Sequence, residues 1–279
     1  LLVGCSGETA PRPQPLTLVV SGDTHGWLVP CGCTSNQSGG LPRRASFLEQ
    51  LRRDREVVVV DVGGAPSGTS LYDRLRLEAI LRGELALGVA AHNIGGPEAR
   101  LGPPYLRQLA DTLQVPLVSA NLLDAEGKPL AEPVRIVAAA GRRLALVGVL
   151  SPQLAPENLQ VVRPQQAILQ ALKRVAGRYD AAIVLAYMPE EELRRLAESL
   201  PEVDAVVGGP TGQPVAPKRF GPTLVTSATN KGKFLACLEA PLGSGPWSAR
   251  IVELDQSYPD HPAQVANTRR FYEELRRRD

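Results

Sequence analysis

The sequence predicts a layered α/β domain, built on one mixed sheet or on two sheets. Over the first two thirds of the chain, short apolar runs alternate with amphipathic segments, as strands alternate with helices. In the last third the apolar runs follow one another closely, as in hairpins. Polar and glycine-rich residues follow several of the apolar runs, at the sheet edge where α/β proteins bind ligands.

The composition limits the classes of function. The chain has 279 residues, enough for one large or two modest domains, with 43% hydrophobic and 22% charged residues. A net charge of +2 gives no field for nucleic acid, and 4% aromatic residues argue against base-stacking platforms. No apolar run in the sequence approaches transmembrane length.

The N-terminal residues indicate export. Leu2-Val3-Gly4-Cys5 resembles a bacterial lipobox, in which the cysteine becomes the lipidated first residue of the mature protein. We therefore expect residues 1–15 to be a signal-peptide remnant, the lipobox and a polar, proline-rich tether. A lipid on Cys5 would hold the protein to a bacterial membrane, on the periplasmic or cell-surface side.

Three further cysteines remain. Cys31 and Cys33 flank one glycine, and export favours a tight disulfide between them. Their thiolates are also metal-ligand types, but no second cysteine pair stands near them, so a structural zinc is disfavoured. Cys237 lies in an apolar run and is expected to be buried.

The first strand, residues 16–20, leads into Ser21-Gly22-Asp23-Thr24-His25-Gly26. Asp23 and His25 bring a carboxylate and an imidazole to the carboxyl end of this strand, and both are metal-ligand types. The alternative is a turn in which Asp23 bonds the backbone and His25 has no role.

The remaining elements follow from periodicity and from β-branched content. Apolar residues spaced three or four apart predict helices at residues 42–53, 72–87, 103–113, 164–178, 190–200 and 262–278. Short apolar or β-branched runs predict strands at residues 56–61, 88–92, 115–121, 134–137, 143–149, 181–186, 203–207, 223–226, 233–239 and 248–254. The strands at 134–137 and 143–149 are expected to form a hairpin across Gly141.

The residues at these strand ends resemble the motifs of the metallophosphoesterase (calcineurin-like) fold. The nearest resemblance is to the N-terminal domain of the periplasmic 5′-nucleotidase and UDP-sugar hydrolase family. Three motifs of that family are intact, in the family's order: Asp23-Thr24-His25-Gly26, Gly39-Gly40-Leu41-Pro42-Arg43 and Ser119-Ala120-Asn121. The resemblance implies a two-sheet sandwich with helices on the outer faces, in a main domain that we place at residues 16–258. The charge pattern of the last residues adds a charged C-terminal helix at 259–279. That helix has no stop signal, which leaves open a further domain after it.

Other positions depart from the family motifs. Where the family has the carboxylate that bridges two metals, this chain has Gly64. Gly96 stands for an asparagine ligand, and Pro97 for the histidine that stabilises the leaving group. The remaining histidine positions of the family are occupied by Tyr187, Pro210 and Gly212. Among the ligand positions that the resemblance implies, Asp23, His25 and Asp61 still match, and glycine and proline offer no side-chain donor.

Neighbouring residues could add to the site. His92 could approach the pocket, but a core histidine is the favoured interpretation. Glu98 matches a structural position of the family, and Tyr187 either offers a phenol or fills vacated space. Arg43 and Arg44 are expected to face a neighbouring helix.

Three hypotheses follow from the resemblance. The first is a pseudoenzyme: a catalytically degenerate 5′-nucleotidase-like domain of an exported lipoprotein, acting as a binding or scaffolding subunit without a cofactor. In some bacteria, similar domains with a Cys-Gly-Cys loop accompany multihaem cytochromes, which implies a cytochrome or another membrane-complex subunit as partner. The near-neutral charge predicts no nucleic-acid partner. The second is an active phosphoesterase with one divalent metal (Mn, Zn or Fe) rebuilt on Asp23, His25 and Asp61, with His92 as a further ligand. The third is a nucleotide- or solute-binding module.

Overall fold

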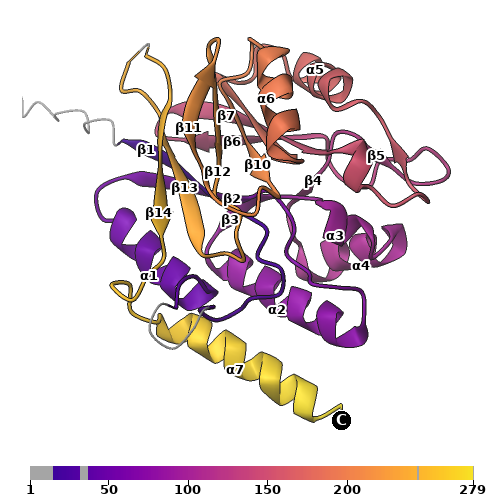
Figure 1. The fold of residues 1–279 in the computed structure, drawn as a ribbon, viewed down its shortest axis with the longest axis vertical. Coiled ribbons are helices and arrows are strands. Elements are labelled where there is room, and N and C mark those ends of the chain that lie inside the picture. The colour runs from indigo at the N-terminus through magenta and orange to yellow at the C-terminus, as the bar shows by residue number, and fades with distance from the viewer. Residues whose placement is uncertain (1–14, 32–36, 244, 279) are drawn as a thin grey trace, which may run out of the picture.

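The protein folds as two six-stranded sheets that lie face to face, with helices on both outer sides (Figure 1). This architecture comes from a computed structural model that describes residues 15–31, 37–243 and 245–278. The predicted two-sheet α/β sandwich is therefore confirmed. Cys5 and Cys33 lie outside the described residues, so the lipid anchor and the Cys31–Cys33 pairing stay predictions.

The first sheet has the order β14-β13-β1-β2-β3-β4. Its strands are β1 (Leu16–Ser21), β2 (Glu56–Asp61), β3 (Val89–Asn93), β4 (Leu117–Val118), β13 (Phe234–Glu239) and β14 (Ser248–Glu253). The strands β1 to β4 run parallel, and the β13–β14 hairpin joins antiparallel to β1. The carboxyl ends of β1, β2 and β3 therefore meet at one edge.

The second sheet has the order β11-β12-β10-β9-β7-β6. Its strands are β6 (Val134–Ala139), β7 (Arg142–Leu150), β9 (Ala181–Tyr187), β10 (Ala205–Gly209), β11 (Val215–Phe220) and β12 (Thr223–Ser227). The four central strands are parallel, and antiparallel strands close both edges. A two-stranded ribbon joins β5 (Leu122–Leu123) to β8 (Gln160–Val161).

Alternation along the strands sorts their side chains into separate cores. On β1, Leu18 and Val20 pack between the two sheets, whereas Val19 packs under the outer helices. Leu146 and Leu185 enter the same inter-sheet core from the second sheet. Because successive side chains of a strand point to opposite faces, a continuous apolar strand can serve two cores at once.

Helices cover the outer face of each sheet. Helices α1 (Leu41–Leu51), α2 (Leu71–Ala86), α4 (Pro103–Leu113) and α7 (Pro262–Arg276) contribute to the core beside the first sheet. Helices α5 (Pro164–Arg174) and α6 (Glu190–Glu198) cover the second sheet. Two short helices complete the described fold, α3 (Gly96–Ala99) and η1 (Pro152–Leu154).

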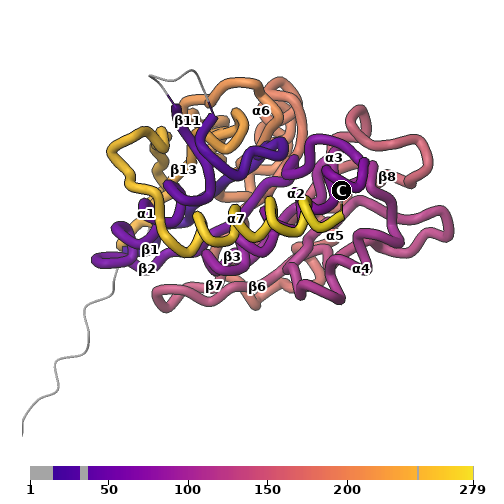
Figure 2. Tube along the Cα trace, turned by 90° about the horizontal axis from the view of Figure 1, so that it is seen from below, coloured from indigo at the N-terminus to yellow at the C-terminus, as the bar shows by residue number. Residues whose placement is uncertain are grey.

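The C-terminal helix is packed against the sandwich. Figure 2 shows α7 lying along the helices of the first sheet, and α7 contacts both α1 and α2. Phe271 is 1% exposed, and Arg82 of α2 pairs with Glu274 at 3.1 Å. The helix is therefore part of the same packed unit as the strands.

Strands β5 and β8 were not predicted, and at two further strands a proline explains the difference from the expectation. The strand expected at 115–121 is reduced to β4, because Pro116 has no N–H to donate and Ser119 N bonds Glu132 O instead. Strand β11 was not predicted, since Pro217 interrupts its pattern; it is an edge strand, where proline is tolerated. In the described part of the chain, no helix combines the length and apolarity needed to cross a membrane.

Replacing Phe271 with alanine tests the packing of α7. Truncating this buried aromatic ring should lower the free energy of unfolding by about 3–5 kcal/mol, measured by urea denaturation. Val265→Ala is the matched control on the same helix, because Val265 is 36% exposed, and it should change stability by less than about 1 kcal/mol. Equal effects of the two substitutions would contradict this packing.

Candidate functional site

The loops that follow β1 and β2 run side by side at the edge of the first sheet. Asp23 N donates to Gly63 O at 2.7 Å, and His25 N donates to Gly64 O at 2.9 Å. Gly26 N donates to Ala65 O at 2.7 Å. Asp23 and His25 both have a φ of 49°, and Gly64 has a φ of 85°. The Asp-x-His turn is thus held by backbone bonds, which leave its side chains free for other contacts.

Asp23 meets Tyr187, which comes from the end of β9 in the second sheet. The Tyr187 hydroxyl donates to Asp23 Oδ1 at 3.3 Å. Burial raises the pKa of Asp23 above its usual value, although the His25 charge and the Tyr187 hydrogen bond lower it in part. Burial, and then the Asp23 charge, raise the pKa of Tyr187. The phenol is therefore a neutral donor to Asp23, and His25 stays exposed.

The aromatic ring of Tyr187 fills the space beside Gly64. A Cβ atom on residue 64 would lie 2.6 Å from Tyr187 Cε2 and 2.9 Å from Asp23 Cα. A Cβ on Gly95 would lie 2.8 Å from Tyr187 Cδ2. Residue 64 is the position of the implied bridging carboxylate, and no side chain fits there beside this ring.

Glu98 fastens the β2 loop to α3. Gly64 N donates to Glu98 Oε2 at 2.9 Å, and Ala65 N donates to Glu98 Oε1 at 2.7 Å. The residue is 2% exposed. Glu98 was expected to be a structural residue rather than a metal ligand. The geometry agrees, because two backbone N–H donors satisfy its buried charge.

The positions of the remaining motifs also carry other contacts. Gly96 and Pro97 form the first turn of α3, and a Cβ on Gly96 would lie 2.7 Å from Leu154 O. Gly209, which precedes Pro210, pairs in register with Tyr187. Gly212 has open space around it.

The hydroxyl of Thr211 lies between two of these positions, Pro210 and Gly212. Thr211, which follows Pro210, bonds the hydroxyls of Ser227 at 2.9 Å and Thr229 at 2.8 Å. The loop after β10 is therefore held by hydroxyl contacts to the end of β12.

Asp61 bonds its own surroundings, and within the part of the chain that the structure describes it makes no hydrogen bond or ion pair with Asp23 or His25. Its Oδ2 accepts from Ser21 Oγ at 2.6 Å, and its Oδ1 accepts from Gly63 N at 2.8 Å. Within the described residues, the group of three metal-capable side chains that the structure does assemble is Asp61, Glu84 and His92. All three are buried.

His92 lies in the core, between two carboxylates. Its Nδ1 is 2.8 Å from Glu84 Oε2, and its Nε2 is 3.4 Å from Glu98 Oε1. Burial alone would lower the pKa of His92, but Glu84, Glu98 and Asp61 together raise it well above 6.5. Burial and the charge of Asp61 raise the pKa of Glu84. The favoured interpretation of His92 as a core histidine agrees with this placement.

Arg44 lies deeper than expected. It faces the neighbouring helix α2, but it does so from within the core, because it is 1% exposed and its guanidinium lies beneath β1. Its NH1 donates to Ser21 Oγ at 2.9 Å, and it lies 3.5 Å from Glu84 Oε1 and 3.8 Å from Asp61 Oδ2. We call Arg44, Asp61, Glu84, His92 and Glu98 the buried charge cluster.

The sequence held a signal for this cluster that periodicity alone did not reveal. Arg44 is three residues after Leu41 and four before Leu48, so all three share one buried face of α1. Glu84 stands on the same face of α2 as Leu77 and Leu81. A charged residue of each sign on two apolar helix faces indicates a buried ion pair.

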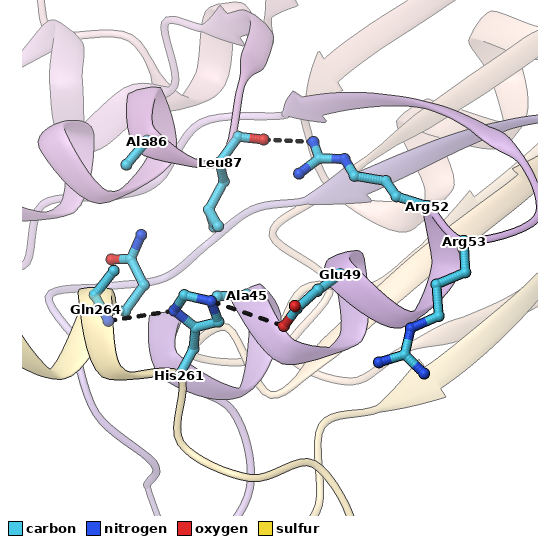
Figure 3. Close-up of a pocket in the computed structure, with 9 residues that line it drawn as sticks. Ala45, Glu49, Arg52, Arg53, Ala86, Leu87, His261 and Gln264 are labelled. Atoms are coloured by element: carbon cyan, nitrogen blue, oxygen red, sulfur yellow. Dashed lines mark hydrogen bonds and ion pairs between the residues drawn. The ribbon is translucent and has the colours of Figure 1, made fainter.

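A separate cavity of about 340 Å³ lies between the ends of α1 and α2 and the start of α7 (Figure 3). Its lining includes Arg52, Arg53, His261 and Glu49, and none of the residues at the strand ends. Leu87 O accepts from Arg52 at 2.6 Å, and Glu49 lies 3.8 Å from His261. These contacts partner two of its basic groups within the protein.

Known proteins share parts of this sequence and fold. No family model matches the chain. The 2',3'-cyclic-nucleotide 2'-phosphodiesterase/3'-nucleotidase of Yersinia enterocolitica is 34% identical over 108 residues, which are 35% of this chain and 17% of that protein.

Solved structures cover much more of the chain. The 5'-nucleotidase precursor of Thermus thermophilus superposes with a TM-score of 0.80 at 22% identity, over 94% of this chain and 59% of that one. The calcineurin-like phosphoesterase YfkN of Bacillus subtilis superposes with a TM-score of 0.77 at 16% identity, over 94% and 97%. The chain has the calcineurin-like phosphoesterase fold. The fold that the motifs implied is therefore confirmed.

The extent of the match differs between these proteins. The chain spans less than two thirds of the length of the Yersinia and Thermus proteins and nearly all of the Bacillus structure. In this fold, the ends of the strands bring the Asp-x-His turn, Gly64 and Tyr187 together at one edge of the sheets.

A substitution at residue 64 tests whether the Tyr187 ring occupies this space. Gly64→Asp should lower the free energy of unfolding by about 2–4 kcal/mol. The aspartate side chain would overlap the Tyr187 ring, and residue 64 has a positive φ that strains any side chain. In a Tyr187→Ala background the same substitution should cost less by about 1 kcal/mol or more, measured as a double-mutant cycle. Additive effects of the two changes would contradict the proposed steric exclusion.

Proposed function

We propose that this chain is a catalytically degenerate 5′-nucleotidase-like domain whose role is binding or scaffolding rather than hydrolysis. The observation that carries the proposal is the contact of Tyr187 with Gly64 and Asp23. At this position the resemblance implies a carboxylate shared between two metal ions, and the structure has an aromatic ring packed on a glycine.

The side chains at the edge do not fit a two-metal centre. Gly64, Gly96, Pro97 and Gly212 offer no side-chain donor atoms. Each divalent ion needs about four to six ligands, and a shared carboxylate fixes the spacing of the two ions. Asp23 and His25 supply at most two ligands, which is too few for one ion. Asp23 Oδ1 already accepts a hydrogen bond from the Tyr187 hydroxyl, and His25 is exposed.

Hydrogen bonds within the chain join the loops of this edge. Three backbone bonds join the β1 and β2 loops, and the two Glu98 oxygens accept from Gly64 N and Ala65 N. These contacts hold the loops together from within the chain. Loops joined in this way, with few side-chain ligands, support a role in holding a partner.

The proposed setting rests on the sequence. The lipobox-like Leu2-Val3-Gly4-Cys5 supports an exported lipoprotein held at a bacterial membrane through Cys5. The Cys31-Gly32-Cys33 loop supports a place in a membrane-associated redox complex, beside a multihaem cytochrome or a similar subunit. The partner would then be a protein at the membrane, and no nucleic acid is involved.

The catalytic part of the proposal is tested by metal analysis and hydrolysis together. The purified chain, incubated with Mn²⁺ or Zn²⁺ and desalted, should hold less than one metal ion per chain. It should not hydrolyse p-nitrophenyl phosphate or a 3′-nucleotide above background, because the edge lacks the donors for a two-metal centre. The Yersinia 3'-nucleotidase is the positive control for the assay. A stoichiometric ion with hydrolysis that His25→Ala abolishes would replace the proposal with a rebuilt, active site.

The membrane anchor has its own test. When the gene is expressed in a bacterium with a lipoprotein pathway, mass spectrometry of the membrane fraction should find an acylated peptide that begins at Cys5. Cys5→Ser should move the protein to the soluble fraction, because the acyl chains supply its membrane affinity. An unmodified peptide that retains residues 1–4 in the mature protein would contradict the anchor.

A further inference from the structure

Arg44 occupies an unusual place for an arginine. Its guanidinium is enclosed beneath β1 and lies against the hydroxyl of Ser21 and the carboxylates of Asp61 and Glu84, at 2.9, 3.8 and 3.5 Å. Thr24 Oγ1 accepts a longer bond at 3.4 Å. A buried guanidinium that faces two carboxylates neutralises charge that would otherwise be costly to bury.

The groups around the guanidinium form a set of metal donors. One ligand atom each from Asp61, Glu84 and His92 lies within 4.8 Å of the other two. Three donors spread evenly around a metal at about 2.1 Å lie roughly 3.6 Å apart, so the widest separation in the set would have to close by up to about 1 Å for all three to bind one ion. Carboxylate oxygen and neutral imidazole nitrogen suit Mn²⁺ and Zn²⁺, so His92 would release one ring proton to solvent as the metal binds.

A second observation points to a ligand at this place. Glu84 Oε1 has no hydrogen-bond partner although the side chain is 2% exposed, and Arg44 Nε is also without a partner. Buried polar atoms in folded proteins are nearly always satisfied. The Glu84 oxygen therefore has free acceptor capacity that faces the guanidinium at 3.5 Å without a hydrogen bond.

We propose that the Arg44 guanidinium is the built-in cation of a three-donor site formed by Asp61, Glu84 and His92, and that this site binds a divalent metal when the guanidinium is removed. The site is separate from the Asp23–His25 edge, because neither residue belongs to its donor set. The inference therefore does not depend on the proposed loss of catalysis at that edge.

The charges of the cluster explain why some cation is needed. Asp61, Glu84 and Glu98 place three carboxylates beside one guanidinium and one imidazole. Glu98 is already bonded to two backbone N–H groups, whereas Asp61 and Glu84 both face Arg44. Removing the guanidinium leaves these two carboxylates without their counter-charge.

The variant that tests this is Arg44→Ala, compared with the unaltered chain by thermal unfolding in EDTA and in Mn²⁺ or Zn²⁺. In EDTA the variant should be strongly destabilised. At a metal concentration about 100-fold above Kd its melting temperature should rise by about 5–10 °C, and titration calorimetry should give one ion per chain. The unaltered chain should show neither response, because the guanidinium holds the site.

Three control variants fix where the metal binds. Arg44→Lys keeps a cation in place and should show no metal response. Arg44→Ala combined with His92→Gln should lose the response, because a donor is missing. Arg44→Ala combined with Asp23→Ala and His25→Ala should keep it, which separates this site from the strand-end edge.

Equal metal responses of Arg44→Ala and the unaltered chain would overturn the proposal, as would a response that disappears with Asp23 and His25. If Arg44→Ala does not fold in EDTA, its refolding yield with and without Mn²⁺ is measured instead. A yield that metal restores supports the proposal, and a yield that metal leaves unchanged overturns it.

Discussion

Charge balance beneath the strand ends is the constraint on which this edge of the molecule depends. Three carboxylates, those of Asp61, Glu84 and Glu98, are buried with 1–2% exposure. A buried carboxylate without a counter-charge or hydrogen bonds is strongly destabilising. Arg44, His92 and the backbone N–H groups of the β2 loop answer this need, and in doing so they fix α1, α2 and α3 to the first sheet.

Hydrogen bonds connect the strand-end loops to these buried charges. Glu98 is held by His92 on one side and holds Gly64 and Ala65 on the other. The β2 loop then carries the Asp-x-His turn through three backbone hydrogen bonds. Tyr187 closes the arrangement from the second sheet, since its hydroxyl bonds Asp23 and its ring covers Gly64. The edge is thus built from neighbours far apart in the sequence.

The sequence predicted the fold well, because strand and helix periods are local properties. Strand β2 and helix α4 begin and end at the predicted residues, and the alternation of Leu18, Val19 and Val20 serves two cores as a buried strand must. The edge strand β11 was missed, because Pro217 interrupts its alternating pattern.

The site was predicted only in part. Asp23, Gly64 and Tyr187 are motif positions that meet, whereas Asp61 bonds Ser21 and Gly63 instead. The Tyr187–Gly64 packing joins two sheets, and no local pattern encodes such a contact. Arg44 and Glu84 were readable as charges on apolar helix faces, but their partners were not.

The packing of Tyr187 on Gly64 has a consequence for the substitutions that this chain accepts. A side chain at residue 64 and the ring at residue 187 exclude one another, so the two positions cannot change independently. Placing a carboxylate at residue 64 would require a smaller residue at position 187, so a buried ring would be lost before any new ligand was gained. Either substitution alone lowers stability. The contact therefore makes residues 64 and 187 one unit of substitution, although they follow strands of different sheets.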